Sequence, residues 1–293
     1  MDTSTTMERE VVITDAIPAA GTAGEAGKAS PPPLISLKSV SKVFSNGTEA
    51  IRTVSLDIPQ HPQFVSLLGP SGCGKSTLLR IISGLDTCSS GSVDWPATVL
   101  DVNKRPLAEI GFVFQEPTLQ PWSTVFENVY LPLRLRGQRR KDVRDQVMEM
   151  LKLVHLERFA HSYPRQLSGG MKMRVSVARA LVMRPRLLLM DEPFAALDEI
   201  TRLQLNNDLL ELWQAQGLTV IFVTHSIYES VYLSDRIVVI GAHPGRIVAD
   251  IPIDAPYPRS EEFRTSRVYN EHCRFVSAQL KVAMSGPRGA FHD

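Results

Sequence analysis

The feature that most restricts the fold of this 293-residue chain is a glycine-rich run that follows a short apolar segment. Residues 64–68 (FVSLL) are typical of a buried strand, and the residues after them fit the pattern G-x-x-x-x-G-K-S/T. The run consists of Gly69, Pro70, Ser71, Gly72, Cys73, Gly74, Lys75 and Ser76, and Thr77 continues it as a helix. Glycines allow backbone N–H groups to converge on phosphate oxygens at the positive end of a helix. The pattern therefore predicts a nucleotide-phosphate cradle between a strand and a helix.

A second polar element follows another apolar run and supplies two adjacent acids. Residues 187–190 (LLLM) are typical of a buried strand, and Asp191 and Glu192 come directly after them. An acid at the end of such a strand helps to hold Mg²⁺ beside the phosphates. We therefore expect Ser76 and Asp191 to bind Mg²⁺, and Lys75 to reach the β- and γ-phosphates. In an extended chain Glu192 points away from Asp191, so it can polarise the attacking water.

The identity of the nucleotide is restricted by a motif that is incomplete. A protein that selects guanine uses Asn-Lys-x-Asp, and the nearest match here, residues 103–106 (NKRP), has proline where the aspartate belongs. GTP is therefore disfavoured. The phosphate cradle alone does not determine which nucleotide binds or which class of nucleotide-binding protein this is.

The apolar segments of the chain predict an α/β fold. Three near-continuous apolar runs read as buried parallel strands: residues 187–190, 219–223 and 237–240. Helical stretches alternate with these runs, so we expect a sheet covered on both faces. Residues 35–40 and 54–58 alternate between apolar and polar, as half-buried strands do. Apolar positions recur at helical spacing from residue 141 to 159, which predicts a helix there.

Composition and motif content along the chain predict three segments. Residues 1–33 are rich in Ala, Gly, Thr and Pro, and we expect them to stay disordered. Residues 34–251 contain the motifs and the predicted strands, so they form the predicted nucleotide-binding domain. Residues 252–293 begin with several prolines and continue as a weakly amphipathic stretch, which predicts a partly helical extension of unknown role.

Charge, cysteine content and hydropathy argue against several classes of function. The chain carries 32 Lys and Arg against 31 Asp and Glu, a balance that argues against nucleic-acid binding. Its three cysteines form no close pair, so neither a disulfide framework nor a zinc site is indicated. The chain has no apolar run near the roughly 20 residues that cross a bilayer, and no signal-peptide pattern. We expect a cytosolic protein that reaches a membrane by docking to another protein.

One further motif gives the chain a resemblance to a known family. Leu167, Ser168, Gly169, Gly170 and Met171 resemble the signature motif of ATP-binding cassette (ABC) ATPases. The common pattern has glutamine in place of Met171, which is not expected to contact phosphate. Small residues at a helix start expose backbone donors, so this motif is a second anion site. By resemblance, Ser168, Gly169 and Gly170 cap the γ-phosphate of an ATP bound to a second copy of the chain.

Other markers of the ABC ATPases stand in the family's order. Gln115 resembles the Q-loop glutamine, which senses Mg²⁺ and links the site to a membrane partner. Asp198 closes residues 195–198, which resemble the D-loop at the dimer seam. His225 resembles the switch histidine that contacts the γ-phosphate. Phe44 is a candidate for stacking on adenine, with ordinary strand core as the alternative.

The resemblance implies a fold and a mechanism. The fold is that of a P-loop NTPase of ABC type: a RecA-like core, an antiparallel β subdomain and an α-helical subdomain inserted at about residues 116–180. A homodimer binds two ATP with Mg²⁺, each between one P-loop and the opposite signature motif. Glu192 is then the general base, and Lys75, Gln115 and His225 assist it. Because Cys73 lies within the phosphate loop, we expect alkylation of its thiol to inhibit hydrolysis.

Two classes of ABC protein remain as alternatives. One is the ATPase subunit of a transporter, and the other is a soluble ABC ATPase that acts in translation or DNA maintenance. A single cassette without a heptad tract favours the transporter. Residues 120–129, 163–166 and 242–248 resemble the corresponding segments of nitrate/sulfonate/taurine-type importers.

The importer resemblance implies two partners, a dimeric integral-membrane permease and an extracytoplasmic substrate-binding protein. The chain is then a peripheral subunit on the cytoplasmic face of the inner membrane, with residues 115–129 docked to the permease. Specificity resides in those partners. The sequence therefore leaves the substrate open among nitrate, an alkanesulfonate, taurine and a small heterocyclic nutrient.

Overall fold

The computed structural model of the protein describes residues 31–96 and 110–284. The predicted tail at residues 1–33 and the near match to a guanine motif at residues 103–106 fall wholly or almost wholly outside these ranges. Within the described part, residues from Pro32 onward form one compact unit.

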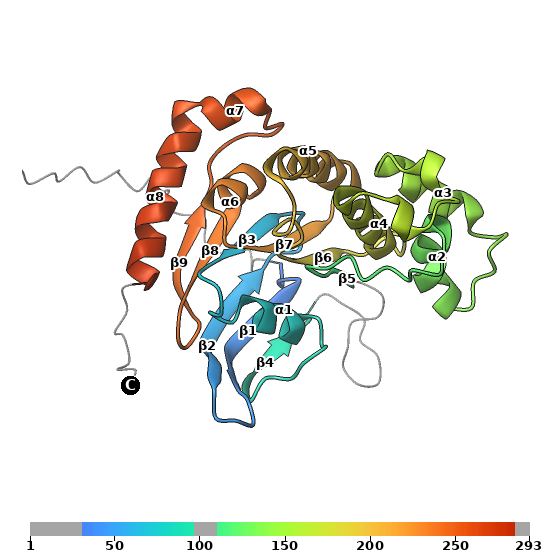
Figure 1. The fold of residues 1–293 in the computed structure, drawn as a ribbon. Coiled ribbons are helices and arrows are strands. Elements are labelled where there is room, and N and C mark those ends of the chain that lie inside the picture. Colours follow the sequence, from blue (N-terminus) through green and yellow to red (C-terminus); the bar gives the residue numbers. More distant parts are fainter. Residues whose placement is uncertain (1–30, 97–109, 285–293) are drawn as a thin grey trace, which may run out of the picture. The chain divides into compact units, whose positions relative to one another are not determined.

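A mixed sheet forms the centre of this unit (Figure 1). Its described strands run in the order β5-β6-β7-β3-β8-β9. Their bounds are β5 (Ile110–Val113), β6 (Leu187–Asp191), β7 (Thr219–Thr224), β3 (Phe64–Leu68), β8 (Arg236–Gly241) and β9 (Arg246–Pro252). Neighbours pair in parallel from β5 through β8, and β9 pairs antiparallel with β8. Every residue of β3, β6 and β7 is buried, so the predicted α/β sheet with two covered faces is confirmed.

A smaller antiparallel sheet in residues 31–96 covers one face. It has the order β2-β1-β4, with β1 at Ile35–Val43, β2 at Glu49–Ile58 and β4 at Ser90–Asp94. Both of its pairings are antiparallel, and β1 and β2 include the half-buried strands that alternation predicts. Apolar side chains of β1, β2 and helix α1 (Lys75–Ile82) share one buried cluster with one face of the central strands. The helix that follows the phosphate loop is therefore held between the two sheets.

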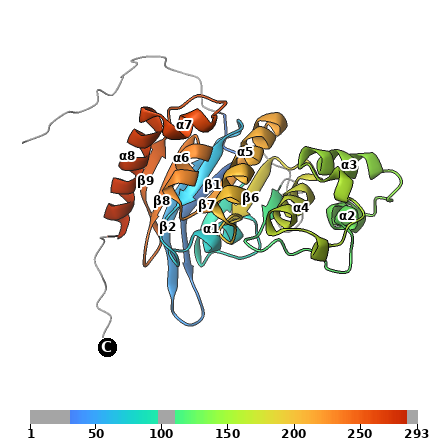
Figure 2. The same cartoon turned by 45° about the horizontal axis from the view of Figure 1, so that its top comes forward.

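Helices gather at the β5 end of the central sheet, as Figures 1 and 2 show. They are α2 (Val125–Leu135), α3 (Arg144–Leu153) and α4 (Gly169–Leu181), with short 3₁₀ turns at Glu157–Phe159 and Pro164–Gln166. The helix predicted for residues 141–159 is too long. It ends at Leu153, because His155 has a left-handed backbone with φ 59° that a helix cannot continue.

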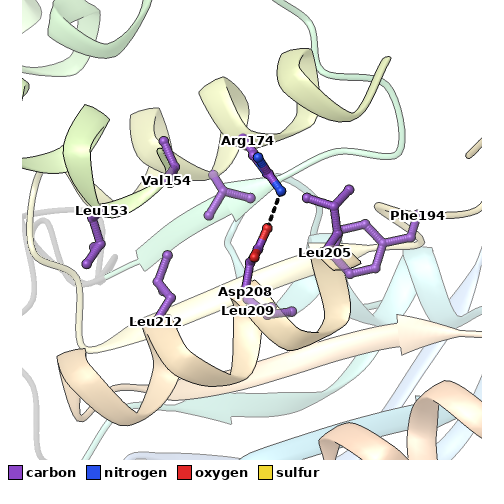
Figure 3. Close-up of a pocket in the computed structure, with 9 residues that line it drawn as sticks. Leu153, Val154, Arg174, Phe194, Leu205, Asp208, Leu209 and Leu212 are labelled. Carbon is purple, nitrogen blue, oxygen red and sulfur yellow. Dashed lines mark hydrogen bonds and ion pairs between the residues drawn. The ribbon is translucent and has the colours of Figure 1, made fainter. Parts of the chain in front are cut away.

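Helix α4 joins this helical group to α5 (Glu199–Gln216) on the central sheet. An Arg174 guanidinium nitrogen lies 2.5 Å from Asp208 Oδ2, which links the two helices directly. Figure 3 shows this pair among the side chains that line a small, mostly apolar pocket. Its other lining residues are Leu153, Val154, Val177, Phe194, Leu205, Leu209 and Leu212. The helical group is thus packed on the core through one charged link and a shared apolar surface.

The C-terminal extension packs onto the central sheet and α6 (Ile227–Leu233). It contains α7 (Glu261–Thr265) and α8 (Arg267–Met284), and α8 contacts α6, β8 and β9. Helix α8 buries Tyr269, Cys273, Val276 and Ala283, whose spacing of three, four and seven residues places them on one face. Among the described residues, none of the helices is both long enough and apolar enough to traverse a bilayer.

Arg259 ties the extension to the end of α6. Its side chain is 5% exposed and donates hydrogen bonds to the carbonyl oxygens of Val231, Tyr232, Ser234 and Ala255 at 2.9–3.0 Å. The last carbonyls of a helix have no partner within the helix, so this guanidinium satisfies groups that burial would leave costly. Burial also lowers the pKa of Arg259, although the guanidinium remains a cation near neutral pH.

Arg259→Met should destabilise the fold, because it leaves several buried carbonyls without a donor. We expect a loss of about 3 kcal/mol in the free energy of unfolding, or roughly 8 °C in Tm. Thermal unfolding of the purified chain measures this loss. Arg267→Met is the matched control, since Arg267 lies on the same extension but is exposed and forms an ion pair with the exposed Glu271. Equal Tm values for the two variants would contradict the anchoring role of Arg259.

Candidate functional site

The predicted site residues follow strands that end at the same edge of the central sheet. In the parallel register Leu68 of β3 pairs with Thr224 of β7, Asp191 of β6 with Val223, and Val113 of β5 with Met190. The phosphate loop follows β3, Asp191 and Glu192 lie at the end of β6, His225 follows β7 and Gln115 follows β5. Parallel pairing therefore brings four separate motifs to one edge, where open α/β sheets bind ligands.

The phosphate loop makes close backbone contacts that only glycine permits. Gly74 has φ 93°, and a Cβ placed there would lie 2.7 Å from the carbonyl oxygen of Ala50. Helix α1 begins at the next residue, Lys75, whose Nζ donates to the carbonyl oxygens of Gly69 and Pro70 at 2.8 and 2.9 Å. The ammonium is thus held inside the loop, where it can meet phosphate oxygens.

Ser76 and Asp191 form the expected metal-binding pair. The Ser76 hydroxyl donates to Asp191 Oδ1 at 2.7 Å, so the oxygens that would bind Mg²⁺ lie side by side. Burial raises the pKa of the Asp191 carboxyl, and a bound cation would favour its charged form again. The described residues contain no group of three or more His, Cys, Asp or Glu side chains that could hold a metal ion. This donor set suits Mg²⁺, which takes one or two protein oxygens and completes its shell with phosphates and water.

Glu192 lies between Lys75 and His225. Its Oε1 is 3.6 Å from Lys75 Nζ, and its Oε2 is 3.0 Å from His225 Nδ1. The expectation of an extended Glu192 is wrong. The residue follows the end of β6 and has a left-handed backbone with φ 44°, held by a hydrogen bond from its N–H to the carbonyl oxygen of Val223. Its side chain is directed by this turn rather than by strand alternation.

The signature turn packs against the D-loop and its helix. Ser168 is the N-cap of α4, and its Oγ accepts a hydrogen bond from the N–H of Met171 at 3.2 Å. A Cβ on Gly169 would lie 3.3 Å from Leu197, and one on Gly170 would lie 2.7 Å from Thr201. Ser168 and Gly169 are exposed, so the start of α4 is free to meet another molecule.

Asp198, Gln115 and Phe44 have different surroundings. Asp198 is exposed and caps α5 by accepting a hydrogen bond from the N–H of Thr201 at 3.0 Å, a bond that also lowers the pKa of its carboxyl. Gln115 is exposed just beyond β5. Phe44 follows the end of β1, is 40% exposed and lies 5.4 Å from Lys42 Nζ. Phe44 is therefore not ordinary strand core, which leaves its ring available for stacking.

The Cys73 side chain is buried beneath the phosphate loop, with its Sγ 4.0 Å from Lys75 Nζ. It is 1% exposed, belongs to the apolar cluster between the sheets, and burial raises the pKa of its thiol. Reactive cysteines are accessible and have a lowered pKa, so the expected inhibition by alkylation of native Cys73 is not supported by this geometry.

Gly245 is a further residue of the site, outside the sequence motifs. It lies in the turn between β8 and β9, donates its N–H to Ala50 O at 3.0 Å and accepts the N–H of Arg52 at 2.9 Å. A Cβ on Gly245 would lie 2.1 Å from the carbonyl oxygen of Cys73. The turn therefore packs against the backbone of the phosphate loop at Cys73 and supports it. The dipeptide Pro244-Gly245 indicates a turn in the sequence, but it does not reveal what the turn contacts.

Comparisons with known proteins agree with this site. Residues 51–195 match the protein family described as ABC transporter. The chain is 44% identical over 252 residues to the Aliphatic sulfonates import ATP-binding protein SsuB of Bacillus cereus, covering 84% of this chain and 96% of that one. It is also 44% identical over 252 residues to an uncharacterised ABC transporter ATP-binding protein of Methanocaldococcus jannaschii. That match covers 84% of this chain and 91% of the relative.

A solved structure shows the same fold. The structure of a dimeric ATP-binding cassette in a post-hydrolysis state, bound to ADP and Pi, matches with a TM-score of 0.65 and 36% identity. The match covers 76% of this chain and all of that chain. The protein belongs to the ATP-binding subunits of ABC transporters. It is an ATPase of importer type with the P-loop ABC fold, and it uses ATP with Mg²⁺.

Gly245→Ala should weaken nucleotide binding, because the added methyl group would displace the Cys73 carbonyl and with it the phosphate loop. We expect the affinity for ATP to fall about tenfold or more. Titration with a fluorescent ATP analogue measures this change.

Gly137→Ala is the control for this prediction. Gly137 has φ 76° but nothing within 4 Å of the added methyl group. Its substitution should cost about 1 kcal/mol of stability through backbone strain and leave the affinity for ATP unchanged. Unchanged affinity in Gly245→Ala as well would show that the turn does not support the loop.

Proposed function

We propose that two copies of this chain bind two ATP between them and use hydrolysis to drive a permease that imports a small sulfonate anion. One observation supports this most strongly. Lys75, Ser76, Asp191, Glu192 and His225 converge at one edge of the sheet through contacts of 2.7–3.6 Å. Ser168 and Gly169 of the signature turn are exposed, and the turn packs against Leu197 of the D-loop and Thr201 of α5. A second copy is the natural source of the missing half of each site.

Each residue at the edge has a distinct role in the proposed hydrolysis. Lys75 and the backbone N–H groups of the loop bind the β- and γ-phosphate oxygens, while Ser76 and Asp191 hold Mg²⁺. When bound, Mg²⁺ neutralises charge on those oxygens. The oxygen of a water molecule attacks the γ-phosphorus as the bond to the β-phosphate oxygen breaks, and Glu192 accepts the proton of that water. His225 holds the Glu192 carboxylate in place through the 3.0 Å contact.

The surface around Trp122 supports the proposed permease dock. Trp122 is 75% exposed in the turn before α2, and large exposed aromatic side chains commonly anchor interfaces. Asn128 fixes this turn from inside. Its fully buried amide donates to the carbonyl oxygens of Gln120, Ser123 and Thr124 at 2.9–3.2 Å and accepts the N–H of Gln120. The turn is therefore rigid, with its aromatic side chain directed outward.

The proposed partners and location follow from the importer relatives. The chain would sit as a peripheral subunit at the cytoplasmic face of the membrane, beneath a permease dimer that receives substrate from an extracytoplasmic binding protein. The sulfonate substrate rests on the relatives named for aliphatic sulfonates import, 43–44% identical to this chain. The second candidate, a soluble ABC ATPase of translation or DNA maintenance, has no observation in its favour.

Glu192→Gln should stop hydrolysis and preserve nucleotide binding, because the amide keeps the size of the side chain but cannot accept the proton. We expect turnover to fall about 100-fold or more. With ATP and Mg²⁺, the variant should accumulate as a dimer, measured by light scattering after size exclusion. Adding Ser168→Arg to it should abolish the dimer and leave ATP bound to the monomer, since Ser168 faces the second copy.

Ser260→Arg in the same Glu192→Gln background is the control for that experiment. Ser260 is also an exposed N-cap residue, but it begins α7 in the C-terminal extension. The ATP-dependent dimer should persist in this variant. Parental turnover in Glu192→Gln, or an intact dimer in the Ser168→Arg variant, would remove the basis for the sandwich.

Trp122→Ala should uncouple the chain from its permease without impairing its own ATPase activity. Loss of an interface tryptophan costs about 2 kcal/mol of docking free energy. In cells that express the assembled complex, uptake of a labelled alkanesulfonate should fall, because the ATPase subunit binds its permease more weakly.

Leu135→Ala is the matched control for Trp122. Leu135 is 78% exposed at the end of α2 but lies outside residues 115–129, so uptake should be normal. Full uptake in Trp122→Ala would exclude this dock. Uptake of labelled nitrate but not sulfonate by the parental complex would contradict the proposed substrate.

A further inference from the structure

A buried carboxylate lies directly behind the switch histidine. Glu229 on α6 is 8% exposed, and its Oε2 accepts a hydrogen bond from the Thr224 hydroxyl at 2.6 Å. Thr224 is the last residue of β7 and immediately precedes His225. The same Thr224 hydroxyl accepts the N–H of Ser226 at 2.9 Å, so it holds the backbone on both sides of His225. The position of Glu229 therefore affects where His225 is held.

An arginine on the D-loop helix approaches the other oxygen of this carboxylate. Arg202, in the first turns of α5, donates one guanidinium N–H to the carbonyl oxygen of Leu197 at 2.9 Å. Leu197 lies in the D-loop, directly before Asp198. The Nε of Arg202 is 3.9 Å from Glu229 Oε1. One guanidinium thus contacts the D-loop and faces the carboxylate behind the switch histidine.

The link between Arg202 and Glu229 is incomplete in this conformation. At 3.9 Å the two atoms are too far apart for a hydrogen bond. Both Arg202 Nε and Glu229 Oε1 are buried, and neither has a hydrogen-bond partner among the described residues. Buried polar atoms without partners are costly, and each such pair in a folded protein needs an explanation. A shift of Arg202 by about 1 Å toward Glu229 would complete the bond.

We propose that Arg202 and Glu229 are positioning residues that transmit the position of the D-loop to His225 and Glu192. When the second copy presses on the D-loop, Leu197 carries Arg202 toward Glu229 and the missing hydrogen bond forms. The completed bond restrains Glu229 and, through Thr224, His225, so that the existing contact between His225 and Glu192 is kept in place during hydrolysis. This inference rests on the proposed ATP sandwich, because the second copy supplies the movement.

A purely structural role fits the contacts less well. A salt bridge that only stabilised the fold would be expected to complete its hydrogen bond in the single chain, as Arg174 and Asp208 do at 2.5 Å. The loose pair instead joins two segments that both belong to the site, the D-loop and the residue before the switch histidine. The geometry therefore points to a contact that closes in another state of the protein.

A double-substitution cycle on the full-length chain tests the proposal. Arg202→Gln and Glu229→Gln should each lower kcat about tenfold, with KM for ATP changed less than about twofold, because nucleotide binding does not need the link. The double variant should be no slower than the slower single variant, since both substitutions break one link. A double variant about 100-fold slower, as the product of independent effects predicts, would overturn the proposal. So would a rise in KM at constant kcat.

The control uses an arginine–carboxylate pair at the opposite edge of the same sheet. Arg236 at the start of β8 pairs with Asp250 of β9, so Arg236→Gln should leave kcat unchanged. Thermal unfolding monitors the fold of each variant. If the glutamine variants unfold, Arg202→Lys and Glu229→Asp replace them in the same cycle with the same expectation.

The two proposals fail in different ways. If the Glu192→Gln variant hydrolyses ATP at the parental rate, the proposed function itself is contradicted. Suppose instead that Glu192→Gln is catalytically inactive and still forms ATP-bound dimers, while substitutions of Arg202 and Glu229 act independently on kcat. That result contradicts only the proposed link between Arg202 and Glu229.

Discussion

Parallel pairing of β3, β7, β6 and β5 is the constraint on which the rest of the site depends. In a parallel sheet all strands end at the same edge, so segments more than a hundred residues apart meet there. Ser76, which follows β3, reaches Asp191 at the end of β6, although β7 lies between those strands. His225 follows β7, and its Nδ1 lies 3.0 Å from Glu192 Oε2. The site is therefore a consequence of strand order and register.

The phosphate loop adds a second constraint, the close approach of three backbones. Gly74 and Gly245 each leave no room for a methyl group beside a neighbouring carbonyl oxygen, and Ala50 O lies within 3 Å of the added carbon in both cases. The loop is thus held between the start of β2 and the turn that follows β8. A binding loop fixed in this way can present its N–H groups without further ordering, which preserves binding free energy for the phosphates.

The sequence predicts the parts of this site that depend on local pattern. Apolar runs of four or five residues identify the buried strands, and the phosphate loop and Asp191 follow directly from what stands after those runs. Contacts between distant residues are different. The burial of Cys73 depends on the second sheet, and the contact between Gly245 and the loop depends on the register of β8 and β9. Neither is encoded in a short motif, and the same holds for the Arg202–Glu229 pair.

Helix ends and strained turns show the same limit at shorter range. The predicted helix through residue 159 ends at Leu153 because His155 adopts a left-handed backbone, which the apolar periodicity does not reveal. Glu192 also departs from the extended geometry expected after a strand. Left-handed residues other than glycine cost about 1–3 kcal/mol and persist only where their surroundings hold them. Periodicity therefore locates an element better than it locates its end.

The left-handed Glu192 also indicates why control of hydrolysis would pass through the D-loop. Its N–H donates to Val223 O of β7 and its carboxylate contacts His225, so both ends of the residue are held by β7 and the residue that follows it. Its carbonyl oxygen accepts the N–H of Ala195 at 3.2 Å, the first residue of the D-loop. A displacement of the D-loop therefore acts on Glu192 directly, through this bond, before it reaches the phosphates. A strained backbone between a rigid strand and a surface loop is sensitive to such a displacement, because small shifts relieve or increase the strain.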